Sequence, residues 1–191
     1  MRIVLLGAPG SGKGTQAVRL VEKLEQPHIS TGELLRSAVE AGTELGQKAR
    51  EVMDRGELVS DDIMLGLIEE RLSRDDVKNG FILDGYPRNI AQAEALDGLL
   101  KRLGQPVNEA LQIDVDTEVV VQRIAGRAAE EDRSDDTEEV VRNRLRVYAE
   151  QTAPVVEYYA AKGVLSRVMG QGTPEEVFQR IMSVLLMHSE S

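Results

Sequence analysis

The residues best suited to chemistry lie near the start of the chain, where positions 7–15 read GAPGSGKGT. A short apolar run precedes this glycine-rich loop, and a helical pattern of apolar residues follows it. In such a loop, backbone N–H groups and the N-terminus of the next helix hold anionic phosphate, while the lysine reaches the outer phosphoryl groups. A simple turn explains the four glycines poorly, because glycine loses much conformational entropy on folding. The loop predicts a bound nucleoside triphosphate.

One position of the loop departs from the general phosphate-loop pattern G-x-x-x-x-G-K-[ST]. Gly14 stands where that pattern has a hydroxyl residue, and Thr15 comes one position later. The departure either weakens the match or marks a narrower group of proteins.

A second group of reactive side chains follows the apolar residues 81–83. Asp84 comes directly after them, and Gly85-Tyr86-Pro87-Arg88 comes next. A carboxylate at the end of a strand can organise Mg²⁺ near a triphosphate, and a guanidinium binds phosphate well. Each signal is weak alone, but together they predict that the same site continues here.

Short apolar runs alternate with helical patterns, which predicts an α/β fold with a parallel sheet and helices on both faces. The expected strands cover residues 2–6, 28–29, 81–83, 110–115 and 165–169. Ligands of open parallel sheets bind beyond the carboxyl ends of the strands. The glycine loop, Ser30, Thr31 and Asp84 follow such ends, so we expect them to share one site.

Two segments lie outside this alternation. Residues 30–59 are polar with helical patterns and predict a small helical insertion. Residues 126–136 have little apolar content and predict a mobile surface loop, although a solvated linker would have the same composition. The rest is expected to complete one domain over residues 1–191.

Capping pairs predict three helix starts, at Ser30 with Glu33, Asp136 with Glu139 and Thr173 with Glu176.

The composition excludes several kinds of site. The chain has 191 residues, no cysteine and only two histidines, His28 and His188, so we expect no disulfide, no thiol catalysis and no cysteine-ligated zinc. The net charge of −10 opposes non-specific binding to nucleic acid or to an anionic membrane. Every apolar run is too short for a membrane span or a signal peptide, and we therefore expect a cytoplasmic protein.

Four separated motifs together resemble one family. GAPGSGKGT, STGELLR, GFILDGYPR, and RSDD followed by RNRL are similar to the nucleoside monophosphate kinases, and among them to the adenylate kinases with a short lid. The resemblance extends from residue 2 to about residue 186. It also explains Gly14, because Gly-Lys-Gly-Thr is characteristic of this family.

The resemblance implies a P-loop fold of three layers, α/β/α, with a five-stranded parallel sheet, an insertion that binds the monophosphate and a short lid at residues 126–136. The implied reaction is reversible phosphoryl transfer from Mg·ATP to AMP, giving two ADP, which maintains the adenine nucleotide balance. The implied ligands are therefore ATP, AMP, ADP and Mg²⁺, with no zinc, no nucleic acid and no membrane, and the implied state is a monomer.

The resemblance also implies roles for individual residues, because phosphoryl transfer depends on alignment and on well-placed cations. The catalytic cations would be Lys13, Arg88, Arg127, Arg133 and Arg144. ATP would contact Gly10, Ser11, Gly12, Lys13, Gly14, Thr15, Arg123, Arg127 and Gly172, with Arg123 against the adenine. AMP would contact Thr31, Gly32, Arg36, Glu57, Leu58, Val59, Gly85, Tyr86, Pro87, Arg88, Gln92, Arg133 and Arg144. Asp84 would hold Mg²⁺ through water. Arg142 and Arg146 match no family site and are expected on the surface.

Three alternatives remain beside this interpretation. A UMP/CMP kinase would share the loop and the arginines, but pyrimidine enzymes typically carry alanine and asparagine where this chain has Thr31 and Gln92. A catalytically silent nucleotide-binding module would be expected to lack Lys13 or the arginines. A nucleic-acid-binding ATPase is disfavoured by the acidic charge and the aromatic content of 3%.

Overall fold

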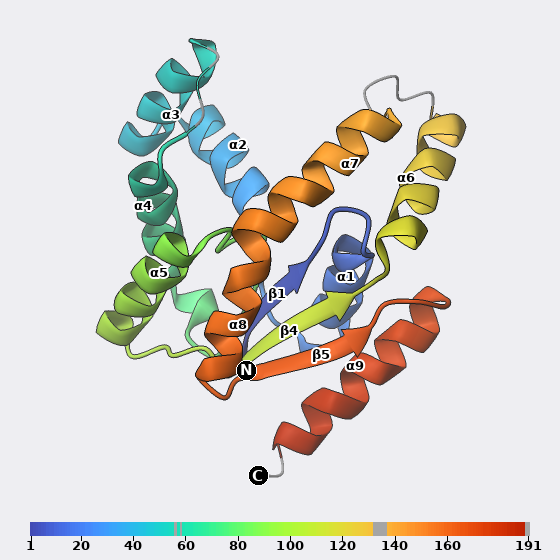
Figure 1. The fold of residues 1–191 in the computed structure, drawn as a ribbon. Helices are drawn as coiled ribbons and strands as arrows, with labels where there is room; N and C mark the ends of the chain where they lie inside the picture. The colour runs from blue at the N-terminus through green and yellow to red at the C-terminus, as the bar shows by residue number, and fades with distance from the viewer. Residues whose placement is uncertain (56, 58, 132–136, 190–191) are drawn as a thin grey trace.

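The structure is a computed structural model that describes residues 1–55, 57, 59–131 and 137–189. Its centre is a five-stranded parallel sheet with strand order β2-β3-β1-β4-β5 (Figure 1). The strands are β1 (Arg2–Gly7), β2 (His28–Ser30), β3 (Phe81–Asp84), β4 (Glu109–Asp114) and β5 (Leu165–Met169). The predicted α/β fold and all five predicted strands are confirmed.

Alternating apolar side chains on β1 build two cores, one on each face of the sheet. Ile3 and Leu5 point into a core with α1 (Lys13–Leu24) and α9 (Pro174–Ser189). Val4 and Leu6 point into the opposite core, which contains α4 (Asp61–Leu72), α5 (Ile90–Leu103) and α8 (Ala153–Ala161). These side chains are at most 3% exposed, as expected for the middle strand of a sheet that is covered on both faces.

The predicted helical insertion consists of α2 (Thr31–Ala41) and α3 (Glu44–Asp54), and it projects from the carboxyl edge of the sheet (Figure 1). A 3-10 turn (Asp75–Val77) follows α4. On the other side of the same edge, α6 (Thr117–Glu131) and α7 (Glu138–Val147) lie beside each other. A π-helical turn (Tyr148–Thr152) joins α7 to α8.

The expectation of a surface loop over 126–136 was wrong for its first part, because α6 continues to Glu131. The reason is local: residues 127–131, RAAEE, are all strong helix formers, and low apolar content alone does not end a helix. Residues 132–136, the rest of the predicted lid, lie outside the described residues.

The three predicted helix caps have different outcomes. Thr173 and Glu176 form the expected reciprocal pair at the start of α9, with distances of 3.2 and 2.8 Å. Ser30 precedes α2 but forms no capping bond, since it is the last residue of β2 and stays in extended register with Asp84. The N-cap of α7 is Thr137, one residue after the predicted Asp136, and its hydroxyl accepts from the amide of Val140.

Candidate active site

The glycine-rich loop connects β1 to α1 and presents backbone amides at the carboxyl edge of the sheet. Gly12 is the N-cap of α1, so no side chain caps the first turn of that helix. A helix start without a side-chain cap keeps its amide groups available for an anion. Lys13, Gly14 and Thr15, the predicted phosphate-binding residues, lie in this first turn. The loop thus has the geometry that its sequence predicts.

Gly10 brings the loop against α6. Its φ is +79°, and a Cβ atom there would lie 2.9 Å from Cδ1 of Ile124 and 3.0 Å from Cγ1 of Val120. A larger residue at this position would therefore push the phosphate loop away from α6. The close approach ties the loop to the helix that carries Arg123 and Arg127.

Arg123 supports the glycine-rich loop rather than standing free in solvent. Its guanidinium donates to the carbonyl of Gly170 over 2.8 Å and to the carbonyl of Ser11 over 3.4 Å. Arg123 therefore connects α6, the glycine-rich loop and the segment after β5. Gly172 lies in that same segment, with a φ of +110°.

Asp84 lies between two basic side chains at the end of β3. Nζ of Lys13 is 3.1 Å from Oδ1 of Asp84, and Nε2 of His28 is 3.2 Å from Oδ2. Burial alone would raise the pKa of the Asp84 carboxyl, but the hydrogen bond from His28 and the charge of Lys13 lower it below its usual value. The carboxylate is thus kept ionised beside the phosphate loop. Sequence analysis did not identify His28 as its partner, because the two residues are 56 positions apart.

The loop after β3 brings the predicted monophosphate contacts together. A Cβ atom on Gly85, whose φ is +86°, would lie 3.0 Å from Oγ1 of Thr31 and 4.0 Å from Nη2 of Arg88. Nε of Arg88 donates to the carbonyl of Gly85 over 3.0 Å. Thr31 begins α2 and is 8% exposed. Thr31 from the second motif and Arg88 from the same motif as Gly85 therefore lie beside one backbone position.

Arg36 lies on α2, one turn after Gly32. A Cβ atom on Gly32 would be 3.3 Å from Nη1 of Arg36, so the guanidinium lies over this glycine. Arg36 is exposed, and its guanidinium forms no hydrogen bond or ion pair with another described residue. An exposed guanidinium with no counter-ion among the described residues is suited to bind a phosphate.

Gln92 is buried, and its side-chain amide bonds to protein groups on both sides. Oε1 accepts from the backbone amide of Arg88 over 2.7 Å, and Nε2 donates to Oδ1 of Asp61 over 2.6 Å. The sequence indicated Gln92 as a nucleotide contact but did not indicate Asp61, which has no motif of its own. Burial of Tyr86, which precedes this segment, together with the charge of Asp61, raises the pKa of its phenol to about 12.

The remaining predicted nucleotide contacts that the structure describes lie on separate parts of the fold. Glu57 is exposed and pairs with Arg55 over 3.2 Å, and Val59 is half-buried before α4. Arg127 on α6 and Arg144 on α7 are exposed. Leu58 and Arg133 lie outside the described residues.

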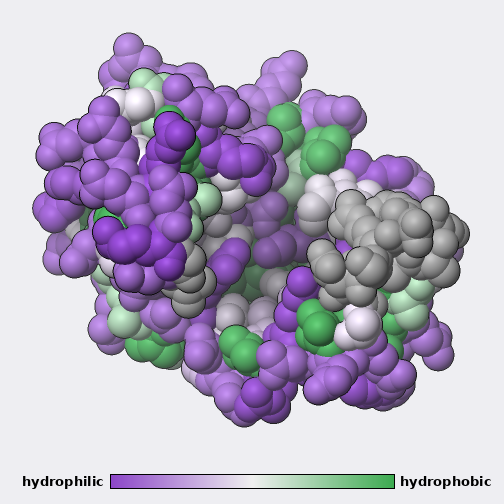
Figure 2. Space-filling model, turned by 90° about the horizontal axis from the view of Figure 1, so that it is seen from above, coloured by the Kyte–Doolittle hydropathy of each residue, from purple (hydrophilic) through white to green (hydrophobic). Residues whose placement is uncertain are grey.

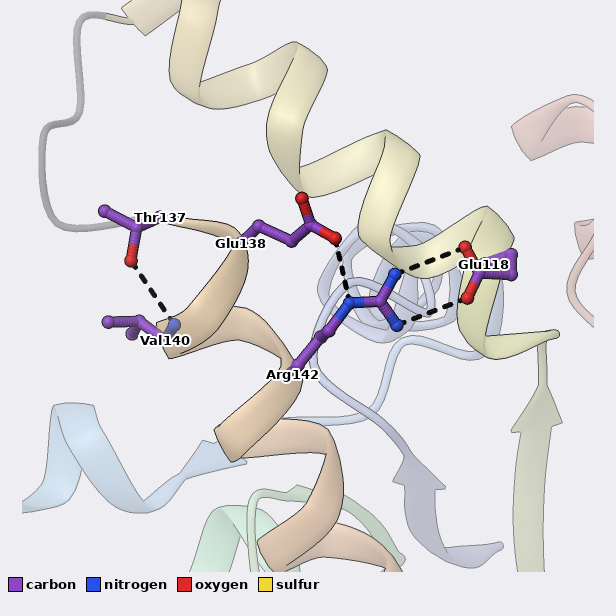
Figure 3. A network of polar contacts seen from close by, with 5 residues as sticks. All are labelled: Glu118, Thr137, Glu138, Val140 and Arg142. Carbon is purple, nitrogen blue, oxygen red and sulfur yellow. Dashed lines mark hydrogen bonds and ion pairs between the residues drawn. The ribbon is translucent and has the colours of Figure 1, made fainter.

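Arg142 and Arg146 lie on the surface, as predicted. Arg142 on α7 bonds with Glu118 on α6 and with Glu138 one turn earlier on its own helix (Figure 3). Arg146 pairs with Glu150 over 3.3 Å. Arg142 therefore links α6 to α7, the two helices that carry Arg127 and Arg144.

Figure 2 shows the molecule from above, with a hollow at its centre. The hollow lies between the side that carries α2 and α3 and the side that carries α6 and α7. Hydrophilic residues cover the α2 and α3 side. Among the residues that the structure describes, no group of three or more His, Asp or Glu side chains could hold a metal ion. No helix within the described ranges is long and apolar enough to cross a membrane.

Comparisons with known proteins point to one family for this chain. A family model described as adenylate kinase matches residues 5–164. An adenylate kinase of Stenotrophomonas maltophilia (strain K279a) is 62% identical over 185 residues, which cover 97% of this chain and 99% of that protein. Adenylate kinases of Xanthomonas campestris pv. campestris (strain 8004) and Xylella fastidiosa (strain 9a5c) are each 60% identical with the same coverage. With a family model over most of its length and relatives this similar, the chain belongs to the adenylate kinase family.

Proposed function

We propose that this protein is an adenylate kinase that transfers a phosphoryl group reversibly from Mg·ATP to AMP, giving two ADP. One observation carries the proposal: β1 and β3 are adjacent and in register, with Leu5 opposite Asp84. The loop that follows β1 and the loop that follows β3 therefore begin side by side. Lys13 of the first loop already reaches Asp84, which precedes the segment that carries Arg88.

The protein's contribution to this reaction is alignment and charge, because phosphoryl transfer needs little covalent help. The amides of residues 10–15 and Lys13 would hold the ATP phosphates. Arg36 and Arg88 would hold the AMP phosphate from the opposite side with planar, bidentate hydrogen bonds. The charge that spreads over the transferred group would then be met by Arg127, Arg133 and Arg144.

AMP is the acceptor that this site fits best among the nucleoside monophosphates. Thr31 offers a buried hydroxyl beside Gly85, and Gln92 offers an amide that Asp61 and the Arg88 backbone hold in one orientation. A site built on oriented hydrogen bonds discriminates strongly against a base that lacks the matching groups. A pyrimidine acceptor is the competing proposal.

Mg²⁺ would enter with ATP and be held mainly by phosphate oxygens and water, since Mg²⁺ dehydrates reluctantly. Asp84 fits this role, because its ionised carboxylate lies beside the phosphate loop and can accept from metal-bound water. The ion would neutralise phosphate charge during the transfer. We also propose, on the strength of the family resemblance, that the protein works as a cytoplasmic monomer.

A coupled assay with Mg·ATP and AMP, UMP, CMP or GMP in parallel tests the proposed function. We expect kcat/KM for AMP to exceed the other values by at least about 100-fold, as a hydrogen-bonding site allows. Preference for UMP or CMP would assign the protein to the pyrimidine kinases, and binding without turnover would assign it to silent nucleotide-binding modules.

A further inference from the structure

Arg88 is held by its main chain as well as by its side chain. Its backbone N–H donates to Oε1 of Gln92 over 2.7 Å, and its carbonyl accepts from Oγ1 of Thr152 over 2.8 Å. The backbone N–H and the carbonyl of Arg88 are thus both bonded to side chains, one from α5 and one from the π-helical turn. These two bonds hold the main chain from which the Arg88 side chain extends.

Thr152 comes from an unusual place, the last residue of the π-helical turn between α7 and α8. Pro154 explains the turn, because proline has no N–H to continue the helical ladder and its ring clashes with the preceding turn. The ladder shifts, and the amide of Ala153 donates to the carbonyl of Tyr148, five residues earlier. Such π-turns are rare and frequently mark functional sites.

The hydroxyl of Thr152 also leaves its own helix. A threonine hydroxyl within a helix commonly bonds to a carbonyl of the preceding turn. Here it donates to a carbonyl 64 positions away in the sequence. In the π-helical turn, the Thr152 side chain points toward the loop after β3.

We propose that Thr152 is a positioning residue for the acceptor nucleotide, which fixes the Arg88 main chain and ties α7 to the loop that binds AMP. The proposal rests on the proposed function, in which Arg88 binds the AMP phosphate. Because α7 carries Arg144, the hydroxyl bond sets the spacing between two of the proposed catalytic arginines. Displacement of a catalytic group by about 1 Å can lower a rate substantially.

The size of the expected effect separates positioning from simple stabilisation. Thr152 is half-buried, and a single hydrogen bond between neutral groups contributes only a small part of the stability of a fold. Loss of the hydroxyl therefore leaves the protein folded. If the bond were merely structural, its loss would lower the melting temperature slightly and leave the affinities for AMP and for ATP at their wild-type values.

The test compares Thr152→Val, which keeps the shape, with Thr152→Ser, which keeps the hydroxyl. The measurements are KM for AMP and for ATP, kcat, the melting temperature, and AMP affinity by calorimetry without ATP. We expect Thr152→Val to raise both the AMP KM and the AMP Kd about tenfold, with the ATP KM unchanged, and Thr152→Ser to restore wild-type values. Thr152→Ala repeats the measurement with a smaller side chain in case the valine variant does not fold.

Ser183→Ala is the matched control, since it also removes one hydroxyl that donates to a carbonyl, over 2.9 Å within α9. It should leave the AMP Kd unchanged. The proposal is overturned if Thr152→Val binds AMP as the wild type does, or if the AMP and ATP KM values rise equally. Arg88→Ala distinguishes a failure of the proposed function from a failure of the positioning role. Unchanged AMP affinity in Arg88→Ala contradicts the proposed function. A strong loss of AMP affinity in Arg88→Ala, with no effect of Thr152→Val, contradicts the positioning role alone.

Discussion

Nζ of Lys13 lies 3.1 Å from Oδ1 of Asp84, across the edge where β1 and β3 are adjacent. The two residues come from different motifs, and His28 contacts the other oxygen of the same carboxylate. The contact joins the phosphate loop to the segment that leads to Arg88. When a triphosphate enters the loop, Lys13 is expected to exchange this carboxylate for phosphate oxygens, which are similar acceptors.

Replacing Lys13 by Met tests its catalytic role. We expect kcat to fall by about 10³-fold or more, because the variant loses a cation at the position where transition-state charge develops. Lys23→Met is the control, since Lys23 is exposed near the end of the same helix and should keep wild-type activity. Steady-state kinetics with circular dichroism as a folding check decides the matter, and near-normal turnover of Lys13→Met would refute the assignment.

Asp84→Asn is expected to change how stability depends on pH. The folded-state pKa of Asp84 is lowered, so the unfolded chain binds a proton more readily than the folded one. The carboxylate therefore stabilises the fold above its unfolded pKa of about 4, and this contribution is lost as the pH falls through the folded-state pKa. Urea unfolding from pH 7 to pH 3 should show a difference between wild type and Asp84→Asn that shrinks toward acid. A difference that grows toward acid would contradict the sign.

Gly10 and Gly14 form a matched pair for the phosphate loop. Alanine at position 10 would require a φ of +79° and a contact of 2.9 Å with Ile124, so we expect it to destabilise the fold by about 1–3 kcal/mol. Alanine at position 14 would meet no atom within 4 Å and lies within α1, so it should be neutral or stabilising by up to about 1 kcal/mol. Urea unfolding without nucleotide measures the free energy of unfolding of both variants. Equal values for the two would show that the close approach at Gly10 does not affect stability.

The acceptor base can be tested with the double substitution Thr31→Ala and Gln92→Asn. Asparagine is one methylene shorter than glutamine, so it cannot span from α5 to both Asp61 and the Arg88 backbone as Gln92 does. We expect the ratio of kcat/KM for AMP to that for UMP or CMP to fall about tenfold or more. The ratio would stay constant if neither residue takes part in base recognition.

The strand–loop–helix structure around the phosphate loop was predictable because all its parts are local. The apolar run, the glycines and Lys13 are contiguous, and each strand carries its own apolar pattern. The extent of α6 was missed, since RAAEE has little apolar content yet favours a helix. The predicted Ser30 cap was wrong, because the position of Ser30 in β2, a tertiary constraint, prevailed over the local capping pattern.

By itself, the sequence determined the order of strands and helices, the phosphate loop, and the motifs that identify the family, because these depend on residue type and spacing over short stretches. Only the tertiary structure decided which groups hold them in place: His28 on Asp84, Asp61 on Gln92, and Thr152 on Arg88. These partners are 31 to 64 positions apart. Their contacts depend on strand register and helix packing, and no local pattern carries that information.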